Sequence, residues 1–172
     1  IQNHNDIKKK IWSKYSGDTI IDKKIGIIGV GNIGKKIIQM LQGFNSNIYG
    51  NDIKKIDHKF IKKYFLKMKT KKFIFNNCDI IIIATDLNKS SYKILNNDSF
   101  KEIKKKPLIV NIGRGASIDN SSLVKALKSK KISGACLDVF EKEPLEKNNF
   151  LRKFDNCIFC SHNAFNTKNE VE

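Results

Sequence analysis

A G-x-G-x-x-G string stands near the start of the chain, at Gly29-Val30-Gly31-Asn32-Ile33-Gly34. Between a strand and a helix, the first glycine of such a string allows a tight turn, the second lets a pyrophosphate approach the backbone, and the third permits close helix packing. The N–H groups that open the helix then face the phosphates. Asp52 follows at the spacing of an acidic residue that binds a ribose 2′-hydroxyl and repels a 2′-phosphate. The string alone could be a structural turn, but this context predicts dinucleotide binding and favours NAD over NADP.

Three later stretches carry side chains suited to acid-base and anion chemistry. They are Val110-Asn111-Ile112-Gly113-Arg114-Gly115, then Gly134-Ala135-Cys136-Leu137-Asp138-Val139-Phe140-Glu141-Lys142-Glu143-Pro144, and then Ser161-His162-Asn163-Ala164-Phe165. These stretches resemble the signatures of the D-isomer-specific 2-hydroxyacid dehydrogenases, and the resemblance runs from Trp12 to Thr167. It matches the NAD-binding domain of that family, which the full enzymes insert into a flavodoxin-like substrate domain built from both chain ends.

The resemblance implies a domain organisation. We expect residues 1–172 to form the NAD-binding domain, and residues 1–20 to supply an inter-domain helix and the segment that enters the domain. The chain does not begin with Met and stops without a closing turn, so we expect the substrate domain to lie outside it.

Arg114, Glu143 and His162 are the expected catalytic residues. Reducing a 2-keto acid requires a cation for the carboxylate, and the fork of Arg114 can pair with it through two hydrogen bonds. The carbonyl oxygen gains negative charge, and a histidine such as His162 titrates near working pH and can supply the proton. The resemblance assigns to Glu143 the stabilisation and orientation of the imidazolium. Each residue alone could be structural, but all three fall in matching surroundings and in the expected order.

The resemblance also implies the cofactor contacts. Asp138 would lie under the nicotinamide, and further residues would line the cleft at the carboxyl ends of the strands, where open α/β sheets bind ligands. The expected NAD-binding residues are Gly29, Gly31, Asn32, Ile33, Gly34, Asp52, Thr85, Asp86, Ser91, Ile112, Gly113, Arg114, Asp138 and His162. No residue is expected to bind a metal.

Two residues depart from the family pattern. Ser161 stands where Pro or Gly usually precedes the catalytic His, a change that affects the loop rather than the acid. Asp86 stands where Pro is common, and a carboxylate near the phosphates would weaken cofactor binding. The string from His162 to Phe165 is most similar to the D-lactate dehydrogenase branch.

Cys157 and Cys160 have the C-x-x-C spacing of zinc and redox sites, with His162 nearby. A second C-x-x-C is absent, His162 is assigned to catalysis, and the segment has the pattern of a buried strand. We therefore expect buried structural thiols here and four free cysteines in all.

Alternating elements would position these residues. Apolar runs predict strands at residues 25–30, 47–51, 80–84, 108–112, 132–139 and 156–160. Helices are predicted after the glycine string, over residues 100–104 behind Asn97-Asp98, and over residues 121–129 behind Asp119 as N-cap. Strands that are apolar throughout indicate burial on both faces, so the expected fold class is α/β, a Rossmann-type doubly wound parallel sheet with helices on both faces. Residues 53–77 are Lys-rich and poorly periodic, and predict no element.

The composition fits one soluble domain, since 172 residues with 40% hydrophobic side chains can bury an ordinary core. The apolar runs are too short for a membrane span and the chain does not open with a signal peptide, so we expect a cytoplasmic protein. The net charge of +16 could indicate nucleic-acid or membrane binding. However, only Arg114 and Arg152 supply the arginine fork, and the joint excess of Lys, Ile and Asn follows A/T-rich codons. We therefore expect no specific nucleic-acid or membrane partner.

These observations favour an oxidoreductase that uses NAD to interconvert a 2-keto acid and a D-2-hydroxy acid. By resemblance, its partners would be that small acid and a second copy, as a homodimer formed through the NAD-binding domain. An NAD-sensing corepressor is the alternative, because members of the same family use this domain for assembly in transcription.

Overall fold

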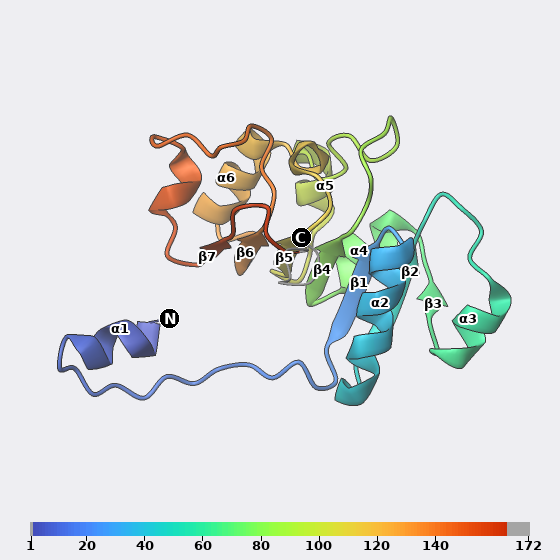
Figure 1. The fold of residues 1–172 in the computed structure, drawn as a ribbon, viewed down its shortest axis with the longest axis horizontal. Coiled ribbons are helices and arrows are strands. Elements are labelled where there is room, and N and C mark those ends of the chain that lie inside the picture. Colours follow the sequence, from blue (N-terminus) through green and yellow to red (C-terminus); the bar gives the residue numbers. More distant parts are fainter. Residues whose placement is uncertain (1, 165–172) are drawn as a thin grey trace, which may run out of the picture.

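A computed structural model describes residues 2–164 of the chain (Figure 1). Within that part, seven strands form one parallel sheet of order β3-β2-β1-β4-β5-β6-β7. The strands are β1 (Lys24–Ile28), β2 (Asn47–Asn51), β3 (Lys67–Met68), β4 (Ile80–Ile83), β5 (Leu108–Asn111), β6 (Gly134–Leu137) and β7 (Cys157–Phe159). The α-helices are α1 (Gln2–Lys8), α2 (Asn32–Leu41), α3 (His58–Lys63), α4 (Lys71–Asn77), α5 (Asn97–Glu102) and α6 (Asn120–Lys128). The 3₁₀ helices are η1 (Gln42–Phe44), η2 (Gly115–Ser117) and η3 (Phe150–Lys153).

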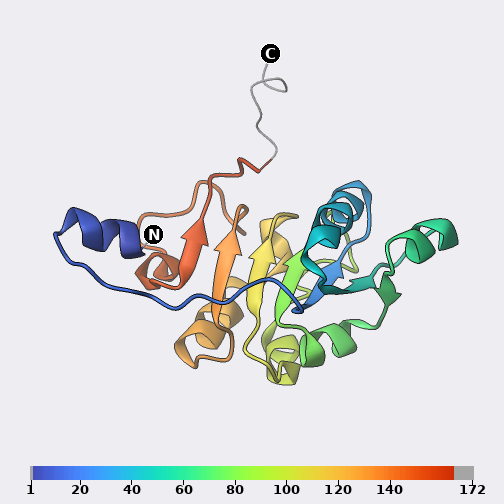
Figure 2. The ribbon, with the colours of Figure 1, turned by 90° about the horizontal axis from the view of Figure 1, so that it is seen from below.

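Helices cover the two faces of the sheet unequally (Figures 1 and 2). Helices α4, α5 and α6 pack on one face and build a core with β4, β5 and β6, which includes Ile74, Phe100, Leu123 and Ile109. Helix α2 packs on the other face, where Ile38 meets residues of β1 and β2. The strands β4 and β5 are therefore fully buried on one face and half-buried on the other. For these two strands the predicted burial on both faces is complete on one face and partial on the other.

The strand order reverses between β1 and β4, because β2 and β3 continue the sheet in one direction and β5 to β7 in the other. At such a switch point, the connections after β1 and β4 leave on opposite faces and open a crevice at the carboxyl edge of the sheet. The fold thus predicts a ligand site at the ends of β1, β2 and β4.

The predicted Rossmann-type fold class is confirmed, and β2 has the predicted bounds. The other five predicted strands are one to four residues shorter than predicted, because their ends turn into the loops that shape the site, and β3 was not predicted. Helix α5 starts earlier than predicted, since Asn96 rather than Asn97-Asp98 accepts the capping N–H groups. Asp119 caps α6 as predicted, through the N–H of Ser122.

The N-terminal helix α1 lies away from the sheet, at the end of a long segment without regular structure (Figure 1). Large apolar side chains remain exposed along it, and Trp12 is 84% exposed. Across residues 2–164, every helix falls short of the length and apolarity that crossing a membrane would need.

Candidate functional site

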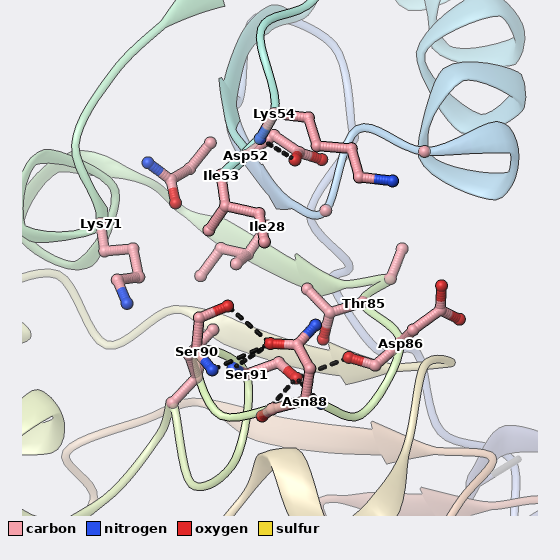
Figure 3. A pocket seen from close by; sticks show the side chains of 15 residues that line it. Ile28, Asp52, Ile53, Lys54, Lys71, Thr85, Asp86, Asn88, Ser90 and Ser91 are labelled. Carbon is pink, nitrogen blue, oxygen red and sulfur yellow. Dashed lines mark hydrogen bonds between the residues drawn. The ribbon is translucent and has the colours of Figure 1, made fainter.

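A cavity of about 190 Å³ lies at the switch point, between the ends of β1, β2 and β4 (Figure 3). Its lining comes from four separate parts of the chain, which the strand order brings together. The lining residues are Ile28, Gly29, Gly31, Asn51, Asp52, Ile53, Lys54, Lys71, Ala84, Thr85, Asp86, Asn88, Ser90, Ser91 and Ile94.

The glycine turn forms one wall of this first cavity. Gly29 has φ +95°, and a Cβ there would lie 2.6 Å from the carbonyl oxygen of Ala84. A Cβ on Gly34 would lie 2.0 Å from the carbonyl oxygen of Gly29, so this glycine allows α2 to pack closely against the turn. A Cβ on Gly31 would meet nothing within 4 Å, so the backbone at Gly31 borders open space that a pyrophosphate could occupy. Asn32, Ile33 and Gly34 open α2 and do not line the cavity themselves.

Asp52 lies at the end of β2, and both of its carboxylate oxygens accept backbone hydrogen bonds. Oδ2 accepts from the N–H of Val30 at 2.7 Å. Oδ1 accepts from the N–H of Lys54 at 2.7 Å (Figure 3). These contacts hold the carboxylate against the glycine turn. A carboxylate has further acceptor sites, so Asp52 can still receive ribose hydroxyls. The cavity therefore suits the adenosine half of NAD.

The opposite wall is the turn that follows β4. Ser91 is buried. Its hydroxyl donates to the carbonyl oxygen of Asp86 at 2.5 Å and accepts from the N–H of Asn88 at 2.8 Å. The hydroxyl therefore shapes the turn, and Ser91, predicted to contact the cofactor, lines the cavity. Thr85 and the exposed side chain of Asp86 border the cavity (Figure 3).

Several lining residues were missed by the sequence analysis, among them Asn88, Ser90 and Lys71. Asn88 accepts the N–H of Ser90 at 2.8 Å through its side chain. An Asn at this position is a sequence signal for such a turn, because its side chain binds the backbone two residues on, and this signal could have predicted the turn. Lys71 opens α4, within the Lys-rich stretch where no element was predicted, and lies across the cavity from Lys54 (Figure 3).

A second cavity, of about 370 Å³, lies at the carboxyl ends of β5, β6 and β7. Its lining includes two predicted cofactor residues, Ile112 and Asp138, together with Ser161 and Asn163. It lies at the same edge of the sheet as the first cavity, at the ends of other strands.

Asp138 is 6% exposed and binds the turn that carries His162. Its carbonyl oxygen accepts from the N–H of His162 at 2.8 Å, and its carboxylate accepts from the N–H groups of Asn163 at 2.8 Å and Ala164 at 3.2 Å. His162 itself has φ +56°, a left-handed conformation that is costly for a residue with a side chain. Three consecutive N–H groups bonded to one residue can hold that conformation.

Glu143 and His162 are joined by a hydrogen bond, with Oε2 2.9 Å from Nδ1. The other oxygen of Glu143 accepts from the N–H of Phe140 at 2.9 Å. Burial raises the pKa of Glu143, but the hydrogen bonds from Phe140 and His162, then the charges of His162 and Arg114, lower it below its ordinary value. Glu143 is therefore an anion at neutral pH and orients the imidazole.

Arg114 follows β5 and is exposed, and its charge reaches Glu143. Its Nη1 donates to the carbonyl oxygen of Gly113 at 2.8 Å, while its own carbonyl oxygen accepts from Nδ2 of Asn111 at 3.0 Å. Asn111 also accepts the N–H of Gly113 at 3.1 Å. The fold thus brings the charge of Arg114 within reach of Glu143, and the side chain of Asn111 fixes the backbone around Arg114.

The expectation of buried thiols was wrong for Cys160, which is exposed because β7 ends at Phe159. Cys157 is half-buried and Cys78 is buried, and burial raises the pKa of the Cys78 thiol to about 12. Within residues 2–164, no three His, Cys, Asp or Glu side chains are grouped as a metal site would require. Phe165, part of the string that suggested a lactate dehydrogenase, lies outside the described residues.

Comparisons with known proteins identify the relatives of this chain. The family described as D-isomer specific 2-hydroxyacid dehydrogenase, NAD binding domain, matches residues 1–164. Glyoxylate reductase from Thermofilum pendens is 35% identical over 160 residues, which cover 90% of this chain and 46% of that protein. D-lactate dehydrogenase from Lactiplantibacillus plantarum is 31% identical over 173 residues, which cover 93% of this chain and 52% of that protein. The structure of apo D-lactate dehydrogenase from Escherichia coli superposes with a TM-score of 0.87 at 28% identity, covering 98% of this chain and 53% of that one. The chain thus spans about half the length of these relatives.

Proposed function

Because the chain belongs to the D-isomer specific 2-hydroxyacid dehydrogenase family and is its NAD-binding domain, we propose that the full protein interconverts a small 2-keto acid and a D-2-hydroxy acid. The observation that carries the proposal is the pair formed by Glu143 and His162, beside Arg114 and next to the cavity that Asp138 lines. An acid, a carboxylate that orients it and a cation are what keto-acid reduction requires.

Each of the three side chains has its own role in this proposed reaction. Arg114 binds the substrate carboxylate through its fork and polarises the neighbouring carbonyl. His162 donates a proton from Nε2 to the carbonyl oxygen, since its Nδ1 contacts Glu143. Glu143 holds the ring and balances its charge in the protonated state. When bound, the reduced nicotinamide supplies the hydride that reaches the carbonyl carbon.

The two cavities support an extended NAD site along the carboxyl edge of the sheet. In this proposal Asp52 binds the adenosine ribose, the glycine turn and the start of α2 bind the pyrophosphate, and Asp138 faces the nicotinamide. The remaining contacts belong to Thr85, Asp86, Ser91, Ile112, Gly113, Arg114 and His162.

The rest of the protein is also a matter of proposal. We place a flavodoxin-like substrate domain outside this chain, with residues 1–20 as the connection between the domains. A homodimer through the NAD-binding domain would cover the exposed apolar side chains of the segment around Trp12. Four free cysteines favour a reducing compartment, the cytoplasm.

The test is an assay of the full-length protein with NADH and a panel of 2-keto acids, starting with glyoxylate and pyruvate. We expect NADH oxidation and a D-configured product wherever the product has a stereocentre. His162→Gln should abolish turnover. If wild type oxidises NADH with none of these acids, or if His162→Gln retains full activity, the proposal is wrong.

A further inference from the structure

Gly115 occupies the position directly after Arg114, at the start of η2, and its Cα abuts the backbone of another loop. A Cβ at this position would lie 1.8 Å from the carbonyl carbon and 1.9 Å from the oxygen of Phe140, and 2.4 Å from the nitrogen of Glu141. The shortest of these distances is the smallest found at any of the ten glycines. The contacted atoms are backbone, so a rotamer change cannot relieve the contact.

The peptide that Gly115 contacts joins Phe140 to Glu141, and Phe140 also binds the acid-base pair through its own N–H. The N–H of Phe140 donates to Oε1 of Glu143 at 2.9 Å, and Oε2 of Glu143 contacts Nδ1 of His162 at 2.9 Å. A displacement of Phe140 therefore moves Glu143 and, through it, the imidazole of His162. On the other side of the contact, the backbone of Gly115 continues directly into Arg114.

The backbone on the Arg114 side cannot easily absorb a displacement. The carbonyl oxygen of Arg114 accepts from Nδ2 of Asn111 at 3.0 Å and from the N–H of Ser117 at 3.1 Å. Gly115 accepts the N–H of Ile118 at 3.0 Å through its own carbonyl oxygen. Any added atom at Gly115 must therefore push the two loops apart.

A salt bridge joins the same two loops from a third segment. Nζ of Lys93 lies 2.9 Å from Oδ1 of Asp119 and 3.8 Å from Oε1 of Glu141. Asp119 follows the loop of Gly115, and Glu141 belongs to the loop of Phe140. Lys93 thus adds an electrostatic contact to the steric one.

We propose that Gly115 is a positioning residue. Its contact with the peptide between Phe140 and Glu141 sets the placement of Arg114 relative to the Glu143–His162 pair. The role rests on the proposed function, because it concerns the distance between the substrate anchor and the proton donor. Catalysis is sensitive to displacements of about 1 Å between such groups, which can cost about a hundredfold in rate.

The test compares Gly115→Ala with Gly43→Ala in the full-length enzyme. Gly43 is the matched control, because a Cβ there meets nothing within 4 Å. We expect Gly115→Ala to lower kcat/KM for the best 2-keto acid at least about tenfold and to move the basic limb of the kcat pH profile. NADH affinity, measured by fluorescence, should change less than about twofold, because the adenosine half of the site is remote from the contact. Gly43→Ala should match wild type.

A second variant covers the case in which Gly115→Ala does not fold. Glu141→Gln removes the charge that pairs with Lys93, and Glu146→Gln is its control, since Glu146 pairs with Lys142 on the same loop but away from the contact. We expect Glu141→Gln to lower kcat by about two- to fivefold and to move the basic limb, with Glu146→Gln unchanged. A merely structural residue would lower the melting temperature without moving the pH profile.

The outcomes separate the two proposals. An active wild type with a Gly115→Ala variant within twofold of it and an unmoved pH profile overturns the positioning role alone. If Gly115→Ala does not fold, a Glu141→Gln variant with activity within twofold of wild type and an unmoved pH profile overturns the positioning role. A wild type inactive with every 2-keto acid overturns the proposed function, and the positioning role with it.

Discussion

Oε2 of Glu143 lies 2.9 Å from Nδ1 of His162, and the two side chains are 38% and 41% exposed. The contact is therefore reached by solvent, and its value lies in orienting the imidazole rather than in stability. Burial raises the pKa of Glu143, but the hydrogen bonds from Phe140 and His162 lower it below its ordinary value, so the carboxylate is ionised beside the ring.

Glu143→Gln should move the basic limb of the kcat pH profile for reduction to lower pH. Reduction consumes the imidazolium proton, and without its anionic partner the imidazolium is lost sooner as pH rises. The measurement is kcat for the full-length enzyme between pH 5 and 10, at saturating NADH.

His162→Gln is the companion variant for that profile. It should nearly abolish turnover with NADH affinity almost unchanged, and adding Glu143→Gln to it should cost little more, because the two residues act as a unit. An unmoved basic limb in Glu143→Gln would leave Glu143 with a structural role only.

Asp52→Ser should relax the preference for NADH over NADPH rather than abolish reduction. Both oxygens of Asp52 are held by backbone N–H groups, so its charge is fixed where a 2′-phosphate would lie. We expect wild type to prefer NADH at least about tenfold in kcat/KM, and the variant less than about threefold. Asp18→Ala, in the exposed segment before β1, should leave the preference unchanged. Equal kcat/KM of wild type for the two cofactors would refute the role of Asp52.

The features that depend only on neighbouring residues in the sequence were the easiest to predict. The glycine string, β2 and Asp52 follow from local sequence, because a strand, a tight turn and a helix each leave a periodic or compositional signal. Asp119 was likewise found as a cap, since N-caps are local.

Contacts between distant loops carry no such signal. Asp138 was assigned to the cofactor by resemblance, and nothing local to it indicates that it also accepts the N–H groups around His162. That arrangement depends on the left-handed φ of His162. The elements α3, β3 and α4 were missed because exposed lysines interrupt the apolar periodicity, although Ile61, Ile74 and Phe75 still pack in the core.

Arg114→Lys should be a damaging substitution despite its retained charge. Lysine loses the planar fork that can bind a carboxylate with two hydrogen bonds, so kcat/KM for the keto acid should fall by about 2 kcal/mol or more, roughly thirtyfold. NADH affinity serves as the internal control and should stay within about threefold. A variant within twofold of wild type would show that another cation holds the carboxylate.

Asp138→Asn should lower kcat even at saturating NADH. The amide has one acceptor oxygen in place of two, so one of the N–H groups of Asn163 and Ala164 loses its partner and the His162 turn loosens. Steady-state kinetics across NADH concentrations separate this effect from weakened cofactor binding. If only the KM for NADH rises and kcat is unchanged, Asp138 serves the cofactor alone.

Asp119→Ala should destabilise the protein by about 1 to 2 kcal/mol at pH 7, the usual range for loss of an N-cap. The Asp119 carboxylate is 18% exposed and accepts from Ser122, Ser121 and Lys93, and these hydrogen bonds lower its pKa well below the ordinary value. Because the native pKa is depressed, the stabilisation is present above the unfolded value near 4 and is lost as pH falls toward the native one. Thermal melts of the full-length wild type and variant from pH 7 down to pH 3 should therefore differ less at the acid end than at pH 7. Asp155→Ala, at an exposed position, should change the melting temperature little at any pH. A wild-type advantage as large at pH 3 as at pH 7 would mean that packing, rather than the carboxylate, stabilises the start of α6.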